Sequence, residues 1–449
     1  MDDMDSMDAV TIKASSRSNT LQYMYRTYGF GIAAACVALL VAIGCARTPA
    51  REERVVFGEQ SLRQRGMREV EGRAIWVTRW DYRTADDVRE IIDNCADAHF
   101  NIVNFQIRGN GTAFYKSSYE PWAWELTSSS PLTTGQDPGF DPLEVAIQRA
   151  RKRGVELHAY MNVLPAWRGK RFPPPAADQL WTTRPEWFMA DRAGQRMVPW
   201  DQEFGDRETF YAFLNPAIPE VLEYTAAVFR EVAGKYDVDG IHLDYIRFPH
   251  EVGDFSYDPE SLKRFQAETG RTPDEAPSQW TDWRGRQVSR VVQRIYDDCK
   301  GVAPHVLVSA SVGRDTVRAR EEMMQRATDW MAADKIDAVF PMIYVRDTAE
   351  VARAVTDFVH HNHGKLVFAG LMIREGNANL LLDQIAVART TGAHGISIFA
   401  YTSLFPNHEP NDLATQLVQG PFRRKAKVPL PPTTREFERP DFLTQRSGE

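Results

Sequence analysis

Residues 237–249 (DVDGIHLDYIRFP) place an imidazole and a carboxylate inside an otherwise apolar strand pattern. With the side-chain alternation of a strand, Ile241 and Leu243 fall on one face, whereas His242 and Asp244 fall on the other. Burying such polar groups is unfavourable unless they are paired. We therefore expect a functional site at the C-terminal end of this strand, with Asp244 as a catalytic carboxylate.

Polar residues follow the same alternation in other predicted strands. Residues 156–163 place His158, Tyr160 and Asn162 on one face and apolar residues on the other. This repetition predicts a polar cleft lined by the inward faces of several strands. The residues expected to bind substrate in or over this cleft are Arg108, His158, Asn162, Trp167, His242, Arg247, Tyr344 and Tyr401.

Hydrolysis by carboxyl groups commonly uses two of them, one to protonate the leaving atom and one to act as nucleophile or base. Asp244 suits the second role, and its alternative is a structural ion pair with Arg247 or Arg108. For the acid we expect Glu375, which follows the seventh predicted strand. The other candidate acids in predicted loops are Asp81, Glu251, Asp254, Asp315 and Asp347.

Several roles remain open for the ligand-binding residues. Arg108 and Arg247 suit a carboxylate, such as the lactyl group of muramic acid, because arginine pairs with carboxylates through two hydrogen bonds. Trp122, Trp124 and Trp167 lie in predicted loops, where they either stack on sugar rings or pack within the loop.

Two functions other than hydrolysis of glycosides also fit these residues. His158, His242 and Asp244 are types that ligate metal in barrel amidohydrolases and deacetylases, but no His-x-His pair ends the first predicted strand. The other alternative is a glycan-binding protein that keeps the barrel without catalysis. For the hydrolase we expect no cofactor and no metal.

The elements that would position these residues alternate regularly between strands and helices. The predicted strands are 73–80, 101–108, 156–163, 240–245, 306–312, 338–344, 366–371 and 395–401. The predicted helices between them include 86–98, 142–153, 219–236, 287–300, 349–361 and 379–391. Eight such units predict an α/β fold with a single (β/α)8 TIM barrel rather than a doubly wound sheet. Three long connections, 109–140, 164–214 and 246–285, all follow strands and are expected over the catalytic mouth.

Several segments together resemble the glycosyl-hydrolase-like 10 family. They span most of residues 72–405 and read RAIWVT at 73–78, GVELHAYMN at 154–162, FLNPAIPEV at 213–221, DGIHLDYIRFP at 239–249 and FPMIY at 340–344. The resemblance implies a TIM-barrel hydrolase of glycosidic bonds that is commonly exported, with bacterial cell-wall glycan among its substrates.

The strand at 240–245 is also similar to that of the chitinase-like families, in which an Asp and an aromatic residue precede a catalytic Glu. Asp244 and Tyr245 match the first two, but Ile246 stands at the position of the Glu. This departure leaves two possibilities: another carboxyl group supplies the proton, or the chemistry is different. Tyr344 matches a tyrosine that such enzymes place near an acetamido group.

The N-terminal residues read as a targeting segment. Residues 29–44 are apolar and uncharged, and LVAIGC at 40–45 resembles a lipobox, which implies lipidation of Cys45. Met24 offers an alternative translation start to Met1, and an uncleaved membrane anchor is the other interpretation of this segment. We expect residues 1–45 to be a signal, 46–68 a flexible tether, 69–420 the barrel domain and 421–449 a disordered tail. The protein is then a lipid-anchored lipoprotein of the bacterial cell envelope, periplasmic or on the outer surface.

The bulk composition limits the partners of the chain. Its 449 residues carry a net charge of −7, which lacks the basic surface that nucleic-acid binding needs. We therefore expect no nucleic acid as a partner. The family resemblance implies a polysaccharide substrate, and the oligomeric state is left open. Of the four cysteines, Cys95 and Cys299 remain after the predicted signal and are expected to be free thiols in helices.

Overall fold

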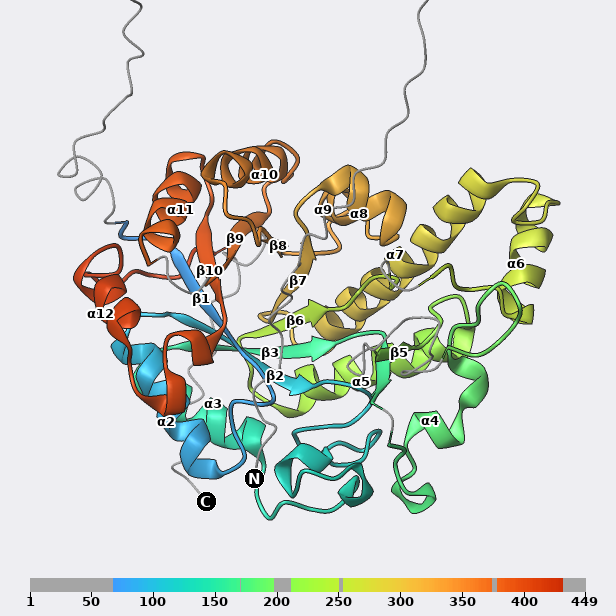
Figure 1. Ribbon diagram of the computed structural model, residues 1–449, viewed down its shortest axis with the longest axis horizontal. Helices are drawn as coiled ribbons and strands as arrows, with labels where there is room; N and C mark the ends of the chain where they lie inside the picture. The colour runs from blue at the N-terminus through green and yellow to red at the C-terminus, as the bar shows by residue number, and fades with distance from the viewer. Residues whose placement is uncertain (1–67, 170, 198–210, 250–252, 374–377, 431–449) are drawn as a thin grey trace, which may run out of the picture. The chain divides into compact units, whose positions relative to one another are not determined.

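Eight parallel strands close into a barrel in the order β1-β10-β9-β8-β7-β6-β3-β2 (Figure 1). This computed structural model describes residues 68–169, 171–197, 211–249, 253–373 and 378–430. The barrel strands are β1 (Gly72–Val77), β2 (Ile102–Arg108), β3 (Glu156–Asn162), β6 (Gly240–Asp244), β7 (Leu307–Gly313), β8 (Ala338–Met342), β9 (Leu366–Met372) and β10 (Gly395–Phe399). The predicted (β/α)8 barrel is confirmed.

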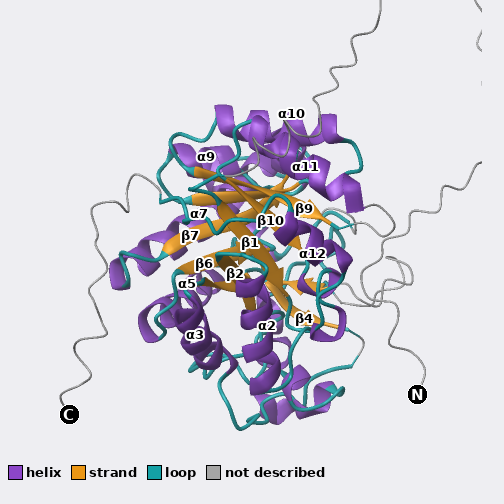
Figure 2. Cartoon of the chain, turned by 90° about the vertical axis from the view of Figure 1, so that its left-hand side faces the viewer, coloured by secondary structure: helices purple, strands orange, loops and turns teal. Residues whose placement is uncertain are grey.

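Helices surround the strands on the outside of the barrel (Figure 2). Those predicted between strands are present as α2 (Ala85–Asp97), α3 (Pro142–Arg153), α5 (Pro219–Lys235), α7 (Pro277–Val302), α10 (Thr348–His360) and α11 (Ala378–Thr390). The structure adds α4 (Leu180–Thr183), α6 (Pro259–Thr269), α8 (Thr316–Glu322), α9 (Ala327–Ala332) and α12 (Asp412–Gln419).

Helix α3 shows how local sequence sets these boundaries. The Asp141 side chain accepts hydrogen bonds from the backbone N–H groups of Leu143 and Glu144, which have no partner within the helix. Pro142 occupies the first turn, where its missing N–H costs nothing. Gly154 ends the helix in the left-handed conformation, with φ of 68°.

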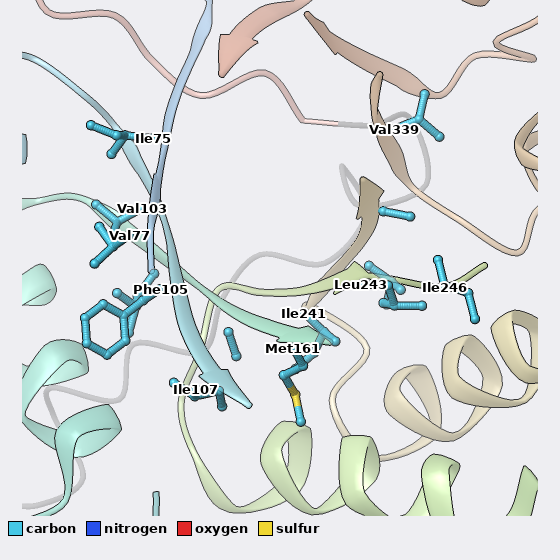
Figure 3. Close-up of a cluster of buried hydrophobic side chains, with 14 of the residues drawn as sticks. Ile75, Val77, Val103, Phe105, Ile107, Met161, Ile241, Leu243, Ile246 and Val339 are labelled. Atoms are coloured by element: carbon cyan, nitrogen blue, oxygen red, sulfur yellow. The ribbon is translucent and has the colours of Figure 1, made fainter. Parts of the chain in front are cut away.

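The outward side chains of the strands form the main hydrophobic core against the helices. Phe105, Met161 and Ile241 are fully buried members of this core, and Figure 3 shows them among the outward-facing side chains of neighbouring strands. Ile246 belongs to the same core and is fully buried. Because its side chain is in the outer core, the position that carries an acid in chitinase-like families does not face the barrel interior here.

A second hydrophobic cluster fills the barrel interior. Trp76 packs edge-on to Phe340, with ring centroids 5.9 Å apart, and Phe340 stacks on Phe368 at 4.5 Å. Large side chains of this kind make the interior of a TIM barrel a packed core rather than a channel. The space for a substrate is therefore restricted to the C-terminal end of the strands.

The long loop after β3 contains a two-stranded antiparallel sheet that the sequence pattern did not predict. Strand β4 (Pro165–Arg168) pairs with β5 (Tyr211–Phe213). The sheet lies among the loops that follow the barrel strands. It brings Arg168 and Tyr211, which are distant in sequence, into one layer over the barrel.

The packed domain extends beyond the predicted boundary at residue 420. Phe422 is fully buried, and its ring lies 5.4 Å from that of Phe100. The backbone N–H of Glu71 donates to the carbonyl oxygen of Lys427 at 2.9 Å. Residues 421–430 are thus part of the folded domain instead of a tail.

Some expected features lie outside the described residues, among them Cys45, Met24, Glu251 and Glu375. Within the described ranges, no helix combines the length and the apolarity needed to cross a membrane. Cys95 and Cys299 lie in α2 and α7, and both are buried free thiols, as expected.

Candidate active site

Asp244 is the last residue of β6 and lies at the C-terminal mouth of the barrel, 7% exposed. The Tyr160 hydroxyl donates to Asp244 Oδ2 at 2.7 Å, and the backbone N–H of Tyr245 donates to Oδ1 at 2.7 Å. Arg247 Nη1 lies 3.5 Å from Oδ1. Donors on two sides fix the orientation of this carboxylate, as a catalytic group requires.

The residue after Asp244 has an unusual backbone conformation. Tyr245 has φ of 49°, in the left-handed region that non-glycine residues rarely adopt. This conformation directs its N–H to Asp244 and leaves its ring 5.3 Å from that of Tyr211. The Arg247 guanidinium also lies over the Tyr245 ring, 4.3 Å from its centroid. Strain of this kind concentrates at functional sites.

A chain of hydrogen bonds joins the ends of neighbouring strands at the mouth. The backbone N–H of Arg79 donates to Gln106 Oε1 at 3.0 Å, and Gln106 Nε2 donates to Asn162 Oδ1 at 3.3 Å. Asn162 Nδ2 in turn donates to the Gly109 carbonyl at 2.8 Å, and Asn162 is the register partner of Asp244. Asn162 therefore lies at the mouth, where the described protein atoms already engage its amide.

Arg79 is the centre of a polar and aromatic cluster that sequence reasoning missed. Its Nη2 donates to the Tyr211 hydroxyl at 2.9 Å, and its Nε lies 3.3 Å from Glu125 Oε1. The guanidinium stacks over Trp80 at 4.3 Å, and that of Arg168 lies 5.1 Å from the same ring. The position of Arg79 at the C-terminal end of the first predicted strand, 73–80, was the available signal, since residues there face the mouth.

Glycine at position 109 makes this cluster possible. A Cβ atom there would lie 2.7 Å from the Arg79 side chain, closer than non-bonded carbon and nitrogen atoms approach. Because Gly109 has no side chain, the Arg79 guanidinium packs directly against the backbone at the end of β2.

His242 lies one layer below Asp244 and is sealed inside the barrel. The Trp76 indole N–H donates to His242 Nε2 at 3.0 Å, and His242 Nδ1 lies 2.8 Å from Ser309 Oγ. Since an indole nitrogen only donates, Nε2 must accept, which assigns a neutral ring with its proton on Nδ1. Burial lowers the pKa of His242 well below its usual value, in agreement with this assignment. With no exposed surface, His242 does not reach substrate, which corrects the predicted binding role.

His158 is deeper still. It is the register partner of Gly240, and a Cβ atom on Gly240 would lie 2.5 Å from the His158 ring. The side chain is fully buried and its Nε2 lies 3.3 Å from Glu156 Oε2. His158 therefore lies two residues deeper in the barrel than His242 and four residues deeper than Asp244. His158 therefore does not bind substrate, which corrects the predicted binding role.

The same spacing bears on the metal hypothesis. His158, His242 and Asp244 occupy three successive layers of the barrel rather than one coordination sphere. Among the described residues, no group of three or more His, Cys, Asp or Glu side chains is arranged to hold a metal ion.

Arg108 is a structural residue instead of a substrate ligand. Its side chain is fully buried, with Nε 2.9 Å from Glu120 Oε2 and Nη2 2.6 Å from Oε1. Its Nη1 donates to the backbone carbonyls of Asn162 and Val163. The register of β2 shifts between Gln106 and Arg108, which turns Arg108 into this loop network.

Tyr401 and Trp167 also lie away from the cleft. Strand β10 ends at Phe399, and Tyr401 begins the short helix η6 (Tyr401–Ser403), where its hydroxyl accepts from Asn94 Nδ2 of α2 at 2.9 Å. Trp167 is fully buried in β4 and donates to the Arg171 carbonyl at 3.1 Å. Neither ring is available to stack on a sugar, because both pack within the protein.

Arg247 and Tyr344 remain near Asp244 as expected. Arg247 Nη1 is buried without a hydrogen-bond partner among the described atoms. Burial, together with the Asp244 charge, raises the pKa of Tyr344, while Arg247 opposes this rise. Contact of these two side chains with a ligand at Asp244 stays a prediction.

The described acid candidates from the sequence have structural roles. Asp315 and Asp347 cap the N-termini of α8 and α10. Asp254 pairs with Arg284 at 2.6 Å. Burial raises the pKa of Asp81 to about 7, but its Oδ2 accepts from the backbone of Thr78.

Removing the Tyr160 hydroxyl tests its contact with Asp244. Burial and the Asp244 carboxylate raise the pKa of Tyr160, so its hydroxyl stays a donor. A hydrogen bond to a charged group contributes about 1.5–3 kcal/mol, so Tyr160→Phe is expected to lower kcat roughly ten- to hundredfold. Tyr115→Phe, which removes a buried hydroxyl next to Glu231 and outside the Asp244 contacts, is the control. An equal loss of kcat in both variants would refute a positioning role.

The neutral state of His242 predicts a pH-dependent stability. Below about pH 6.5 the unfolded chain protonates this histidine while the folded chain does not, so stability falls by up to about 1.4 kcal/mol per pH unit until the folded pKa is passed. Burial also lowers the pKa of His305 and His394, so these residues contribute with the same sign. Urea unfolding of the wild type and His242→Gln from neutral to acidic pH isolates the His242 contribution. Identical pH dependence in the two proteins would contradict the assignment.

Comparison with known proteins identifies a family model that matches this chain. The family model described as Glycosyl hydrolase-like 10 matches residues 71–378. "Glycosyl hydrolase YngK" of Bacillus subtilis is 26% identical over 299 residues, which are 61% of this chain and 54% of that protein. "Glycosyl hydrolase DigH" of Escherichia coli K12 is 25% identical over 276 residues, which are 58% of each chain. The chain thus spans just over half the length of these curated relatives.

Solved structures support the fold alone. The glycoside hydrolase domain of PgaB (BpsB) from Bordetella bronchiseptica aligns with a TM-score of 0.55 at 15% identity, covering 76% of this chain and 97% of that domain. The catalytic domain of a β-amylase from Paenibacillus polymyxa aligns with a TM-score of 0.54 at 9% identity, covering 80% and 99%.

Proposed function

Because the chain belongs to the Glycosyl hydrolase-like 10 family, whose model spans residues 71–378, we propose that it hydrolyses the O-glycosidic bonds of a polysaccharide. The observation that carries this proposal is the Asp244 carboxylate, which is held at the barrel mouth by Tyr160 and the backbone of Tyr245. Glycosidases place such a carboxylate beside the anomeric carbon of the sugar.

Asp244 acts as the nucleophile or as the base that activates water. In the first case its oxygen bonds to the anomeric carbon, and water later cleaves this bond. In the second case Asp244 takes a proton from the water that attacks the anomeric carbon. In both cases a second carboxyl group gives a proton to the leaving oxygen, so that one water is consumed for each bond cleaved.

The substrate we favour is the glycan strand of peptidoglycan. Arg247 Nη1, buried without a hydrogen-bond partner among the described atoms, suits a carboxylate or a sugar hydroxyl. Two further arginines, Arg79 and Arg168, lie over the Trp80 ring at the same end of the barrel. Such a cationic and aromatic rim suits the lactyl carboxylate of muramic acid next to a sugar ring.

Export to the cell envelope follows from the N-terminal sequence. The lipobox-like LVAIGC at 40–45 would place a lipid on Cys45 and anchor the enzyme to a membrane. This location matches the proposed substrate, since peptidoglycan lies outside the cytoplasmic membrane.

Product analysis tests the proposed function. The purified protein is incubated with peptide-free glycan strands, chitin oligomers and α-glucans, and soluble fragments are identified by mass spectrometry. We expect defined fragments from the glycan strands. Retention of glycan strands without fragments would instead indicate a glycan-binding protein, and neither release nor retention of any of the three would refute the proposal.

A further inference from the structure

Glu125 is a buried carboxyl group in the loop that follows β2. It lies in the short helix η1 (Trp124–Leu126) and is 3% exposed. Its Oε1 lies 3.3 Å from Arg79 Nε, whereas its Oε2 has no hydrogen-bond partner among the described atoms. Burying an oxygen without a hydrogen bond destabilises the fold. A hydrogen bond to a bound ligand would explain why this buried oxygen is present.

A short series of contacts connects Glu125 to Asp244. Arg79 holds Glu125 and donates to the Tyr211 hydroxyl at 2.9 Å. The Tyr211 ring lies 5.3 Å from that of Tyr245, whose backbone N–H holds Asp244. The two carboxyl groups thus come from the loop after β2 and the end of β6, and they belong to one network at the mouth.

The side chain of Trp124, which precedes Glu125 in the chain, also lacks a hydrogen bond among the described atoms. Trp124 Nε1 is also buried without a hydrogen-bond partner, and its ring lies 6.1 Å from that of Trp80. The Trp124 N–H is a donor, and Glu125 Oε2 accepts when ionised and donates when protonated, so the two atoms can bind hydroxyl and glycosidic oxygens of a sugar. The indole rings beside them offer apolar faces for a sugar ring.

Burial also affects the pKa of Glu125. It raises the pKa of the carboxyl group, while Arg79 and Arg168 lower it to a smaller extent. Other titratable groups near this network include Tyr82, which interacts with Glu125 and Asp81. Tyr211 and Tyr160 interact with Arg79. A general acid needs a pKa above that of an ordinary carboxyl group, and burial shifts Glu125 in this direction.

The other described acids in the loops after the strands are engaged. Glu120 pairs with Arg108 through both oxygens. Asp258 caps α6 and accepts from Asn215 Nδ2, and Asp254 pairs with Arg284. Glu125 Oε2 is, within the described ranges, a fully buried carboxyl oxygen of these loops that has no hydrogen bond.

We propose that Glu125 is the second catalytic carboxyl group and protonates the leaving glycosidic oxygen, an inference that rests on the proposed hydrolysis at Asp244. The Oε2 proton passes to the glycosidic oxygen as the bond from that oxygen to the anomeric carbon breaks, and its electron pair stays on the oxygen. Glu125 regains a proton from the attacking water, directly or through solvent. Arg79 is a positioning residue that holds Oε1.

The test compares two leaving groups in Glu125→Gln. Cleavage of peptide-free glycan strands needs a proton on the leaving oxygen. A dinitrophenyl glycoside of a chitin oligomer instead releases dinitrophenolate, a stable anion that needs no proton. We expect kcat on glycan strands to fall by about 10²-fold or more. On the dinitrophenyl glycoside we expect a loss of less than about tenfold, because acid catalysis is dispensable there.

The pH profile gives a second measurement. A general acid must be protonated, so wild-type kcat declines as the pH rises through its pKa. In Glu125→Gln this decline disappears. Glu120→Gln is the matched control, because it neutralises another buried carboxyl group of the same loop and should lose activity equally on both substrates or not at all. If Glu125→Gln does not fold, Glu125→Asp replaces it in the test. Its shorter side chain withdraws the carboxyl group, so kcat should again fall more on glycan strands than on the dinitrophenyl glycoside.

The outcomes separate this inference from the proposed function. Wild-type cleavage together with equal losses of Glu125→Gln on both substrates, or no loss on either, would overturn the role of Glu125 and leave hydrolysis at Asp244 intact. No wild-type cleavage of either substrate would overturn both.

Discussion

Asp244→Asn is expected to lower kcat on glycan strands by about 10⁴-fold while the strands still bind. Asparagine keeps the size of the side chain and can still accept from the Tyr160 hydroxyl, which donates to Asp244 Oδ2 at 2.7 Å. It cannot attack the anomeric carbon or take a proton from water. Initial rates and pull-down of insoluble glycan measure the two properties separately.

Asp315→Asn provides the matched control. Asp315 also follows a barrel strand, and its side chain caps α8 by accepting from the Arg318 backbone N–H. Asparagine caps helices about as well as aspartate, so this variant should retain wild-type activity. If Asp244→Asn also kept wild-type turnover, Asp244 would not be the catalytic carboxylate.

Glu120→Ala is expected to destabilise the domain by about 3–5 kcal/mol. The Arg108–Glu120 pair is fully enclosed, with side-chain exposures of 0% and 1%. Removing the carboxylate leaves the Arg108 guanidinium buried without its counter-charge, and Tyr224 also loses its contact with Glu120 Oε1. Urea unfolding at constant pH measures the change in unfolding free energy.

A double variant distinguishes loss of charge balance from loss of packing. Arg108→Met combined with Glu120→Leu removes both charges and keeps most of the side-chain volume, so it should recover much of the stability. A double variant as unstable as the sum of Arg108→Met and Glu120→Leu would show no energetic coupling between the two residues and would contradict a penalty from the isolated charge.

The sequence predicted the barrel because strand alternation and helix periodicity depend on local patterns. The inward faces of β3 and β6 were predicted correctly, since Leu157, Ala159 and Leu243 are in the outer core and Tyr160 and Asp244 meet at the mouth. Alternation assigns a face to each residue, and the tertiary contacts of these strands agree with it.

Depth along the barrel was not predictable from the same pattern. His158, His242 and Asp244 share the inward side, but only Asp244 ends its strand at the mouth. The level of a residue depends on the stagger of neighbouring strands, which is a tertiary property. The two histidines were therefore assigned to substrate, although they belong to the sealed interior.

Irregular backbone caused the remaining errors. The register shift in β2 moved Arg108 out of the predicted inward series, and the end of β10 at Phe399 moved Tyr401 toward α2. Glu125 and Tyr211 come from long loops whose paths depend on tertiary contacts, so no local pattern indicated that they meet at Arg79.

Cleavage of peptide-free glycan strands in water enriched in heavy oxygen tests the central claim most directly. If Asp244 directs hydrolysis at the barrel mouth, each new reducing end carries one heavy oxygen atom by mass spectrometry, and Asp244→Asn yields no labelled ends. Wild-type fragments without the heavy isotope, or labelled ends from Asp244→Asn at the wild-type rate, would contradict it.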